Sequence, residues 1–328
     1  MQIAMLGDVM LGRLVNQHLK TTGPGYPWGD TLAVLRQADV RFANLECVLA
    51  AGGEPEPGKV FHFRSDLNNV GSLLAAGIDV VSLANNHVLD FGEDAFREML
   101  PALDDNGILH AGAGPDRDAA RQPAVRRVGT AAVGFIAFTD NQPDWEATDT
   151  SPGIYYVPVA DADRRVAELL DLVRGTRARV QLLIVSAHWG PNWGSGVPSG
   201  HRDLARVLID AGADVVFGHS AHIFRGVGLH RNRPIIYSAG DFVDDYAVDP
   251  VERNDQSFIF MLETDGNEPR TLRLYPTVIE DFQARLAGGS SRDIAGRMQR
   301  LSKHLGTLST WRETGGFLEI RVDQERGE

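Results

Sequence analysis

The stretch IDVVSLANNHVLDFG, residues 78–92, joins the pattern of a buried strand to a polar cluster at its end. Its first seven residues, 78–84, are almost continuously apolar, which is typical of a strand covered on both faces. Asn85, Asn86 and His87 follow directly. An amide oxygen can bind a hard cation and an imidazole can give or take a proton, whereas two asparagines alone are also common turn residues. Because His87 adds nothing to a turn, we expect this cluster to carry chemistry.

Four further polar clusters follow apolar runs in the same way. They are Gly7-Asp8 after 3–6, Asn44-Leu45-Glu46 after 40–43, His188-Trp189-Gly190 after 182–186 and Gly218-His219-Ser220-Ala221-His222 after 215–217. In an open α/β sheet the carboxyl ends of parallel strands lie along one edge, and ligands bind there. Carboxylate, amide and imidazole groups gathered at one edge are the donor types of a metal site. The repeated placement therefore predicts a metal centre.

Each member of these clusters also has a simpler interpretation. Asp8 is either an oxygen ligand or a turn or capping aspartate, and Glu46 is a ligand, a partner of a ligand histidine, or an edge carboxylate facing water. His188 by itself would be a structural histidine at a strand end. His219 and His222 lie three residues apart, so both rings can face one point if the turn is extended or helical. The metal interpretation depends on all of these residues occurring together.

Composition limits the classes of partner. The chain has 328 residues, of which 43% are hydrophobic and 23% charged, as in an ordinary globular protein. The net charge is -12 and no basic patch occurs, so we expect no nucleic-acid partner. An acidic protein can still take a small-molecule or peptide substrate with anionic groups, because bound divalent cations dominate the local field.

Cysteine content and hydropathy bear on location. The single cysteine, Cys47, excludes an intramolecular disulfide. No run approaches the ~20 apolar residues that span a bilayer, and the opening MQIAMLGD has neither a basic nor a long apolar segment. We therefore expect a cytoplasmic protein with no membrane segment. The sequence does not specify its oligomeric state.

The order of the predicted elements indicates an α/β fold. Predicted helices are 30–38, 65–76, 93–105, 160–174, 201–211 and 291–304, and predicted strands are 2–7, 39–46, 78–84, 124–128, 131–138, 180–186, 213–217, 234–238, 257–262, 271–275 and 317–322. Helices and strands alternate in the first half, and strands are more frequent in the second. Two sheets packed together between helices would fit this order. Because no long linker interrupts the pattern, we expect residues 1–328 to form one domain.

Taken together, the clusters resemble the poly-γ-glutamate capsule-biosynthesis (CapA) family, a branch of the calcineurin-like metallophosphoesterase superfamily. The segments that carry the resemblance are Gly7-Asp8, Gly12-Arg13, Asn44-Leu45-Glu46, 61–64, 83–92, 188–190, 218–222 and 237–242. The resemblance extends over residues 2–246. It implies a four-layer α/β/β/α sandwich, metallophosphoesterase-like, with metal at the strand ends. Residues 247–328 would add closing strands and a helix to the same domain.

The resemblance also implies roles for individual residues. The implied ligands of one or two divalent ions (Mn, Fe or Zn) are Asp8, Asn86, His188, His219 and His222. Glu46 would stand near the bridging aspartate of the superfamily, which makes it a further candidate ligand. His87 would occupy the place of a general acid that protonates the leaving oxygen. In metallophosphoesterases two ions activate a hydroxide for in-line attack.

Three departures from the superfamily pattern affect the metal site. Met10 stands where a ligand histidine is usual, Asn44-Leu45-Glu46 replaces a Gly-Asp motif, and the closing Gly-His-x-x-His pair is one residue wider than usual. Compared with the superfamily pattern, one ligand histidine is thus missing, a glutamate replaces an aspartate, and the two closing histidines are one residue further apart. A single-metal site, weak binding of a second metal and a site that needs no metal all fit these changes.

Two segments near the clusters bear on the substrate. The segment GDFVDDY, residues 240–246, adds three carboxylates, including Asp241, which either hold a cation or an amine or form a solvated acidic loop. Arg13 and Arg64 are candidates for clamping a carboxylate or phosphate, although structural salt bridges would explain either one equally well. We therefore take Arg13, Arg64 and Asp241 as candidate substrate-binding residues.

Three functions fit these patterns. The order of the motifs favours a metal-dependent hydrolase of a phosphoester or a polyglutamate-like polymer. The altered ligand set leaves room for a peptide Cα epimerase that needs no metal and uses Asp8 and His219 as an acid–base pair. A non-catalytic component of capsule assembly is the third interpretation, and the lack of a membrane segment weighs against it.

Overall fold

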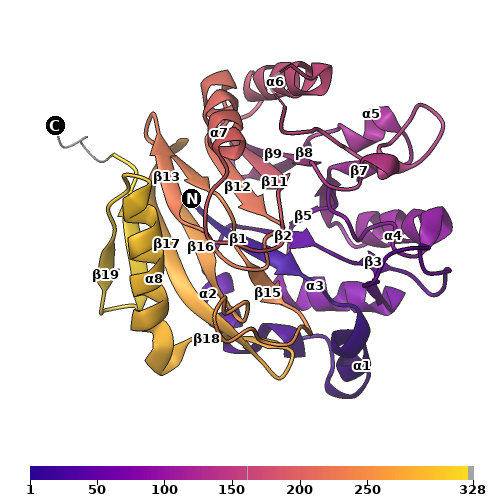
Figure 1. Cartoon of the computed structure of the whole chain (residues 1–328), viewed down its shortest axis with the longest axis horizontal. Coiled ribbons are helices and arrows are strands. Elements are labelled where there is room, and N and C mark those ends of the chain that lie inside the picture. Colours follow the sequence, from indigo (N-terminus) through magenta and orange to yellow (C-terminus); the bar gives the residue numbers. More distant parts are fainter. Residues whose placement is uncertain (161, 324–328) are drawn as a thin grey trace.

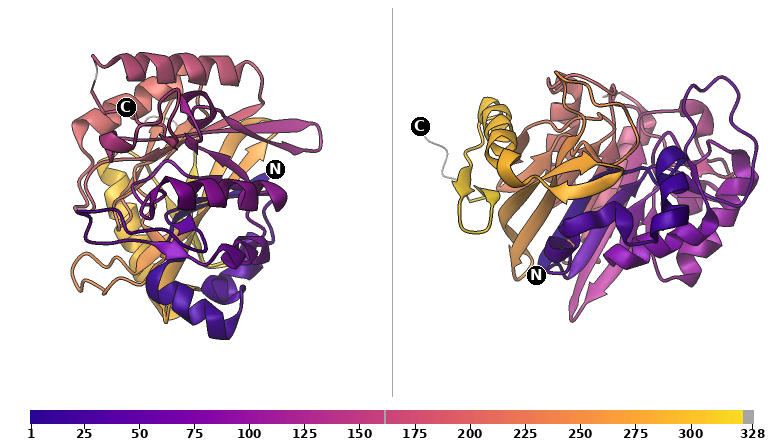
Figure 2. Two further views of the ribbon diagram at one scale, coloured as in Figure 1. Left: turned by 90° about the vertical axis from the view of Figure 1, so that its right-hand side faces the viewer. Right: turned by 90° about the horizontal axis from the view of Figure 1, so that it is seen from below.

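Two β-sheets packed face to face, with helices on their outer sides, make up the centre of the molecule (Figures 1 and 2). The computed structural model describes residues 1–160 and 162–323. In spatial order, the larger sheet contains β19 (Thr310–Arg312), β20 (Phe317–Arg321), β17 (Glu268–Glu280), β16 (Gln256–Asp265), β1 (Gln2–Val9), β2 (Val40–Leu45), β5 (Val80–Ser82) and β6 (Leu109–Ala111). Two short strands extend it, β15 (Asp241–Val243) beside β1 and β18 (Gln283–Leu286) beside β17.

The smaller sheet faces the larger one. Its strands are, in order, β13 (Val227–His230), β14 (Arg233–Ile236), β12 (Val215–His219), β11 (Leu182–His188), β9 (Ala131–Thr139) and β8 (Ala124–Val128). Two small pairs lie outside both sheets, β3 (Val48–Leu49) with β4 (Arg64–Ser65), and β7 (Ala113–Gly114) with β10 (Gly153–Ile154). The α-helices are α1 (Arg13–Thr22), α2 (Leu32–Leu35), α3 (Val70–Ala76), α4 (Gly92–Asp105), α5 (Arg117–Ala120), α6 (Arg164–Arg177), α7 (Ser199–Ala211) and α8 (Ser291–His304).

Strand β1 is apolar on both faces because it lies between two cores. Ile3 and Met5 point into the core between the two sheets, where Phe42 stacks on Phe135 with ring centroids 5.3 Å apart. The alternating residues Ala4 and Leu6 join a second core under the helices of the larger sheet. Because successive side chains of a strand point to opposite faces, a strand between two layers must be apolar throughout.

Helices cover the outer face of each sheet. On the larger sheet the covering residues include Val15 of α1, Leu73 of α3 and Phe96 of α4. On the smaller sheet they include Leu169 of α6 and Leu208 of α7. With the sheet-to-sheet core between them, these contacts give four layers. The four-layer α/β/β/α sandwich predicted from the sequence is therefore confirmed.

The strands that matter for function run in parallel. In the larger sheet β1 pairs in parallel with β2, and β2 with β5. In the smaller sheet β11 pairs in parallel with both β9 and β12. Parallel strands place their carboxyl ends at one edge, and the polar clusters follow those ends.

The C-terminal third continues the larger sheet. Strand β16 pairs antiparallel with β1, and β17 and β20 follow outward. Helix α8 and β19 lie at the side of the molecule opposite α3 and α4 (Figure 1). This continuous pairing supports the proposal that residues 247–328 belong to the same domain as the motifs.

Several local predictions differ from the structure. Helix α1 was not predicted, although Val15 and Leu19 bury one of its faces. The helix predicted from Asp30 is a 3-10 helix, Tyr26–Thr31, followed by the single turn α2, and Asp30 instead accepts a hydrogen bond from the Leu286 amide at 2.8 Å. Ser65 lies in β4 and does not cap α3, which begins only at Val70. In each case a contact with another element decides the local conformation.

Candidate metal centre

Polar side chains from both sheets meet at one edge of the sandwich. Asp8 lies near the end of β1 and Asn44 near the end of β2, and the two residues are register partners. His188 and His219 end β11 and β12 and are also register partners. All four residues are at most 1% exposed. Because the sheets face each other, the two pairs converge, as predicted from the strand-end positions.

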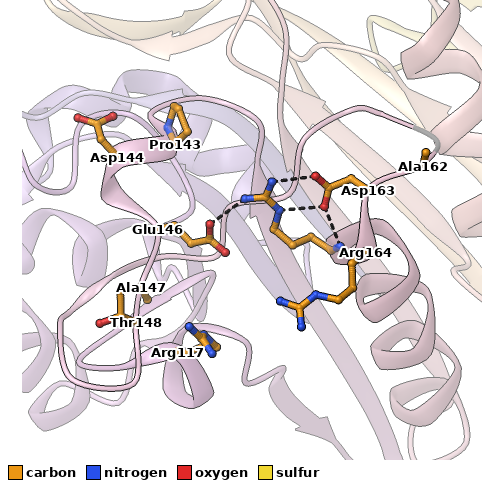
Figure 3. Close-up of a pocket in the computed structure, with 10 residues that line it drawn as sticks. Arg117, Pro143, Asp144, Glu146, Ala147, Thr148, Ala162, Asp163 and Arg164 are labelled. Atoms are coloured by element: carbon orange, nitrogen blue, oxygen red, sulfur yellow. Dashed lines mark hydrogen bonds and ion pairs between the residues drawn. The ribbon is translucent and has the colours of Figure 1, made fainter.

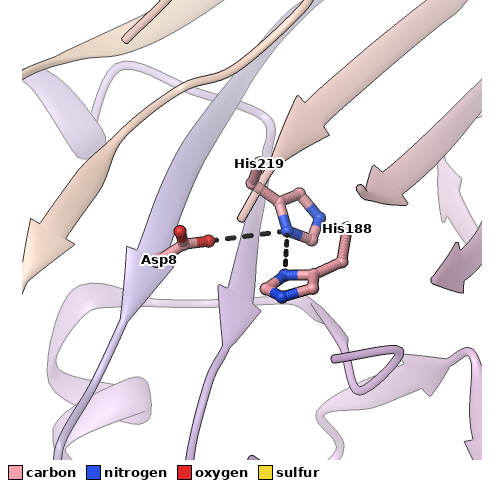
Figure 4. A group of neighbouring side chains, drawn as sticks. All are labelled: Asp8, His188 and His219. Carbon is pink, nitrogen blue, oxygen red and sulfur yellow. Dashed lines mark hydrogen bonds and ion pairs between the residues drawn. The ribbon is translucent and has the colours of Figure 1, made fainter. Parts of the chain in front are cut away.

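The first group of possible metal ligands is Asp8, His188 and His219 (Figure 4). One ligand atom from each lies within 4.8 Å of the others. His219 Nδ1 is 3.5 Å from Asp8 Oδ1 and 3.0 Å from His188 Nδ1. The other nitrogen of His219 lies 2.7 Å from Ser186 Oγ, which directs Nδ1 toward Asp8. Such a hydrogen bond on the far side of the ring is how ligand histidines are usually oriented.

A second group shares Asp8 with the first and adds His222 and Asp241. Their ligand atoms also lie within 4.8 Å of one another, and His222 Nδ1 is 2.9 Å from Asp241 Oδ1. Asp241 begins β15, which pairs in parallel with β1 so that Asp241 is the register partner of Asp8. The sequence pattern predicted that Asp241 binds substrate. In the structure it lies instead among the possible ligand atoms.

Asn44 connects Asp8 to Glu46. Its Nδ2 lies 2.8 Å from Asp8 Oδ1 and 2.8 Å from Glu46 Oε2, so one amide group donates to both carboxylates. Asn85 in turn donates to Asn44 Oδ1 at 3.0 Å, which fixes the orientation of that amide. Glu46 Oε2 is 3.8 Å from His188 Nδ1. Glu46 therefore lies beside the first group, and its role as a ligand remains a prediction.

Asn86 and His87 reach the same cluster from the segment after β5. Asn86 Oδ1 lies 3.0 Å from His188 Nε2. His87 Nε2 lies 3.9 Å from Glu46 Oε1, and its Nδ1 lies 2.6 Å from Asp90 Oδ2. Burial lowers the pKa of His87 to about 4. A neutral imidazole that donates its Nδ1 proton to Asp90 presents a lone pair at Nε2, so at neutral pH this nitrogen accepts a proton more readily than it gives one.

Two further residues of this cluster, Asp90 and Lys59, were not predicted from the sequence. Lys59 Nζ lies 2.6 Å from Asp90 Oδ1 and 4.5 Å from the ring centroid of Trp145, and it also donates to the backbone carbonyl of Asn86. Asp90 follows His87 by three residues, and one turn brings two side chains with this spacing together. The spacing could therefore have predicted the contact between His87 and Asp90. Lys59 lies in the loop 51–59, whose glycines and prolines predict only a surface loop. The neighbouring sequence does not indicate that Lys59 pairs with Asp90.

Burial has opposite effects on the acids and bases of the cluster. It raises the pKa of Asp8 to about 6 and that of Asp241 well above its usual value. It raises the pKa of Glu46 as well, and the neighbouring Asp8 adds to this rise. It lowers the pKa of His219 to about 3. Neutral imidazole is the form that binds metal, and crowded carboxylates gain most from a cation.

The donor set fits a divalent cation. It offers imidazole nitrogens and carboxylate oxygens, which suit Zn, Mn and Fe. Asp241 Oδ2 is buried and has no hydrogen-bond partner within the described residues. A buried carboxylate oxygen without a donor is costly, and a bound cation would remove this cost. Asp8, His188, His219, His222 and Asp241 are thus suited to hold one or two ions.

Residues 2–246 match the model of a protein family described as bacterial capsule synthesis protein PGA_cap. The chain belongs to this family. The resemblance to the CapA family predicted from the motifs is therefore confirmed.

Individual relatives agree with this assignment. The chain is 33% identical to a probable polyglutamine synthesis accessory protein of Mycobacterium tuberculosis, over 92% of this chain and 90% of that protein. It is 23% identical to the capsule biosynthesis protein CapA of Bacillus anthracis, over 98% of this chain and 78% of that protein. A hypothetical protein of Thermus thermophilus shares the fold with a TM-score of 0.51 at 18% identity, over 84% of this chain and 98% of that one. In the part of the PGA_cap chain that the structure describes, every helix is too short or too polar to span a bilayer.

Arg13 lies beside the candidate metal centre of this PGA_cap family chain. Its Nε is 3.3 Å from Asp245 Oδ2, and its guanidinium lies 5.2 Å from the Phe63 ring and 5.9 Å from the Tyr246 ring. The Tyr246 ring is in turn 4.8 Å from the His222 ring. Arg13 has a φ of 50°, a strained left-handed conformation for a residue other than glycine. A role for Arg13 in substrate binding remains a prediction.

The other candidate arginine, Arg64, has a different environment. Its guanidinium lies 4.8 Å from the ring centroid of Phe91, the residue after Asp90. This stacking on the loop beside the centre explains its position without a substrate. A role for Arg64 in substrate binding remains a prediction.

A cavity of about 690 Å³ between Pro143 and the start of α6 lies apart from the metal centre (Figure 3). Its arginines all have acidic partners. Arg165 pairs with both Asp163 and Glu146 at 2.8 Å, and Arg117 and Arg164 each pair with another carboxylate. Each arginine that lines this cavity therefore has at least one acidic partner, which offsets its positive charge.

Proposed function

We propose that this PGA_cap family protein is a metal-dependent hydrolase that acts on an anionic substrate. The observation that carries the proposal is the position of Asp8, which belongs to both three-residue groups of possible ligands. A carboxylate shared by two neighbouring groups is the arrangement expected where two ions lie close together. His188 and His219 would complete one site, and His222 and Asp241 the other.

Divalent ions held by these groups would supply a Lewis acid and a metal-activated water. The protein's own residues orient the donors. Asn44 holds the Asp8 carboxylate through its amide, Ser186 holds the His219 ring, and Asp241 holds the His222 ring. His87, oriented by Asp90, places Nε2 toward Glu46 and can exchange a proton with a reacting oxygen.

The substrate is proposed from the charges at the site and the names of the relatives. These names refer to polyglutamine synthesis and capsule biosynthesis, which supports a peptide-like polymer as an alternative to a phosphoester. Arg13 at the rim supplies a cationic group for a carboxylate or phosphate. Bound divalent cations would offset the acidic surroundings for such a substrate.

The geometry does not support the epimerase pair suggested by the sequence. An epimerase removes a proton from one face of a carbon and returns it to the other, so its two groups must stand on opposite sides of the substrate. Asp8 Oδ1 and His219 Nδ1 are 3.5 Å apart, which leaves no room for a carbon atom between them. One relative is named an accessory protein, so a non-catalytic role in polymer assembly is also possible for this chain. The test below distinguishes that role from hydrolysis.

The test begins with protein purified without chelator. We expect bound Mn, Fe or Zn, and hydrolysis of an aryl phosphate, a phosphodiester or a glutamate oligomer that chelator abolishes and added metal restores. Asp8→Asn should lose both metal and activity, whereas Asp265→Asn, at an exposed hairpin, should keep both. Metal-free protein that exchanges solvent deuterium into a peptide Cα would overturn the proposal in favour of an epimerase. Metal-loaded protein with neither activity would favour the assembly role.

A further inference from the structure

A second cavity, of about 130 Å³, lies between helix α7, the end of helix α8 and strands β13 and β14 at the edge of the smaller sheet. Three basic side chains and one tyrosine give it its polar lining: Arg202, Arg206, His304 and Tyr237. Among the described residues, no carboxylate and no candidate metal ligand lines it. The cavity is therefore distinct from the candidate metal centre and opposite to it in charge.

The two arginines of the cavity have weak partners or none. Arg202 and Arg206 stand four residues apart on α7, so their side chains share one face of the helix. Arg206 Nη1 lies 3.8 Å from Asp203 Oδ1, in an ion pair whose side chains are 56% and 61% exposed. Within residues 1–160 and 162–323, Arg202 makes no ion pair. Because an exposed ion pair contributes little free energy, both guanidinium groups remain available to an anion.

Tyr237 is the buried member of this lining, at 3% exposed. Its hydroxyl group has no hydrogen-bond partner in the part of the chain that the structure describes, and its oxygen keeps accessible surface. Gly228 also lines the cavity, and a Cβ atom there would lie 3.5 Å from this oxygen, so the glycine leaves the space beside it free. A buried tyrosine hydroxyl usually has a partner, and a ligand in the cavity would supply one.

The basic groups converge on this hydroxyl from two helices. Burial raises the pKa of Tyr237, whereas the positive charges of Arg206 and Arg202 oppose this rise. The two guanidinium groups are therefore near enough to act on the hydroxyl, although neither is bonded to it. His304, the last residue of α8, adds an imidazole from a second helix. An anion between these groups would receive hydrogen bonds from several directions.

We propose that this cavity binds a phosphate group. Guanidinium groups present forked N–H donors that match phosphate oxygens, and the Tyr237 hydroxyl adds a donor at the buried wall. Two arginine charges balance a phosphate dianion, whereas a carboxylate carries only one charge. At roughly 30 Å³ per water-sized group, the cavity holds about four such groups, which is close to the size of phosphate. A larger ligand would enter with its phosphoryl group alone.

The experiment measures binding of inorganic phosphate by isothermal titration calorimetry, at fixed pH and ionic strength, to protein treated with chelator so that no metal contributes. Acetate and methylphosphonate serve as comparison probes. We expect phosphate to bind and acetate to bind at least about tenfold more weakly, because acetate lacks the second charge and the third oxygen. Methylphosphonate binding equal to that of phosphate would identify the ligand as a phosphoryl group on a larger molecule. Weaker binding of methylphosphonate would identify it as free phosphate.

Three variants locate the bound phosphate. Arg202→Gln and Arg206→Gln should each weaken phosphate binding about tenfold, and Tyr237→Phe, which removes only the hydroxyl, about threefold. Arg174→Gln is the matched control, because Arg174 is also an exposed helical arginine with an aspartate three residues before it. This control should bind phosphate as wild type does.

Equal binding of acetate and phosphate, or phosphate binding unchanged by Arg202→Gln and Tyr237→Phe, would overturn the inference. Phosphate binding that appears only after metal is added and is lost in Asp8→Asn would also overturn it, in favour of the candidate metal centre. No turnover is measured, so failure of the hydrolase proposal would leave this result unchanged. Conversely, hydrolysis by a protein that binds no phosphate when metal-free would remove only the cavity site.

Discussion

His87 Nδ1 lies 2.6 Å from the Oδ2 atom of Asp90, within one turn of the segment that follows β5. This contact fixes which nitrogen of His87 faces Glu46 and the metal centre. The same Asp90 oxygen accepts the Phe63 amide at 2.7 Å, so the carboxylate itself is held in place. The relationship makes His87 a residue with a defined tautomer, which a proton-transfer role requires.

Replacing Asp90 by Asn tests this orientation. Asp90 Oδ2 contacts both the Phe63 N–H and His87 Nδ1, and Oδ1 faces Lys59 Nζ. An asparagine therefore either turns its NH₂ toward the Lys59 ammonium or turns it toward His87, where it reverses the tautomer and loses the Phe63 hydrogen bond. We expect kcat to fall by about 10²-fold, the scale of a lost acid–base contribution, with little change in KM. Steady-state kinetics together with metal analysis would check this. Unchanged kcat with normal metal content would show that the orientation of His87 is unimportant.

Lys59 offers a second test of the same pair. Its Nζ lies 2.6 Å from Asp90 Oδ1, and its side chain is only 16% exposed. We expect Lys59→Met to lower kcat about tenfold through a misplaced Asp90, on the scale of one partly buried charged hydrogen bond. Lys59→Arg should retain most of the activity. Lys20→Met, which removes an exposed ion pair to Asp66, should have no effect, and an equal loss in both methionine variants would contradict the prediction.

The shared position of Asp8 predicts how metal content responds to single substitutions. His188→Ala should remove the ion of the first group, Asp241→Asn the ion of the second, and Asp8→Asn both. Elemental analysis of dialysed protein measures this directly. The prediction fails if Asp241→Asn binds as much metal as wild type, because Asp241 would then be outside the ligand set.

The raised pKa of Asp8 predicts an effect on stability in the absence of metal. Its pKa rises from 3.8 to about 6, so the folded state binds more protons than the unfolded state between these pH values. The protonation of Asp8 therefore adds to the free energy of unfolding below pH 3.8, and this contribution is lost as the pH rises through about 6. Metal-free Asp8→Asn should be more stable than wild type at pH 8, by on the order of 3 kcal/mol, with the difference vanishing near pH 4. Urea unfolding at both pH values would measure it, and added Mn²⁺ should reverse the order.

Gly7 sets the approach of β1 to β15. A Cβ atom at this position would stand 1.9 Å from the Gly240 carbonyl oxygen. We expect Gly7→Ala to separate Asp8 from Asp241 and to destabilise the protein by about 1–3 kcal/mol, as overpacking does. Gly175→Ala, in α6 with open space around it, should instead be neutral or stabilising by about 1 kcal/mol. Chemical denaturation of both variants would compare them, and a stable, fully metal-loaded Gly7→Ala would contradict this account.

The amino-acid sequence determined the layers and most of the candidate metal centre. Segment 78–84 is almost continuously apolar because both faces of β5 within it are covered, and that property is local. The ends of such strands could therefore be located, and with them Asp8, Asn86, His188 and His219. Parallel pairing then brings those ends to one edge whatever the details of the loops.

Only the tertiary structure decided how these groups pair. Asp241 becomes the partner of Asp8 because β15 returns to β1, and Lys59 becomes the partner of Asp90 because a loop folds back over that segment. Residues of these types in loops look the same in sequence whether they face water or a buried site. Periodicity reports which face of an element is covered, but not which distant element covers it. The ligand geometry therefore follows from packing between elements far apart in the chain.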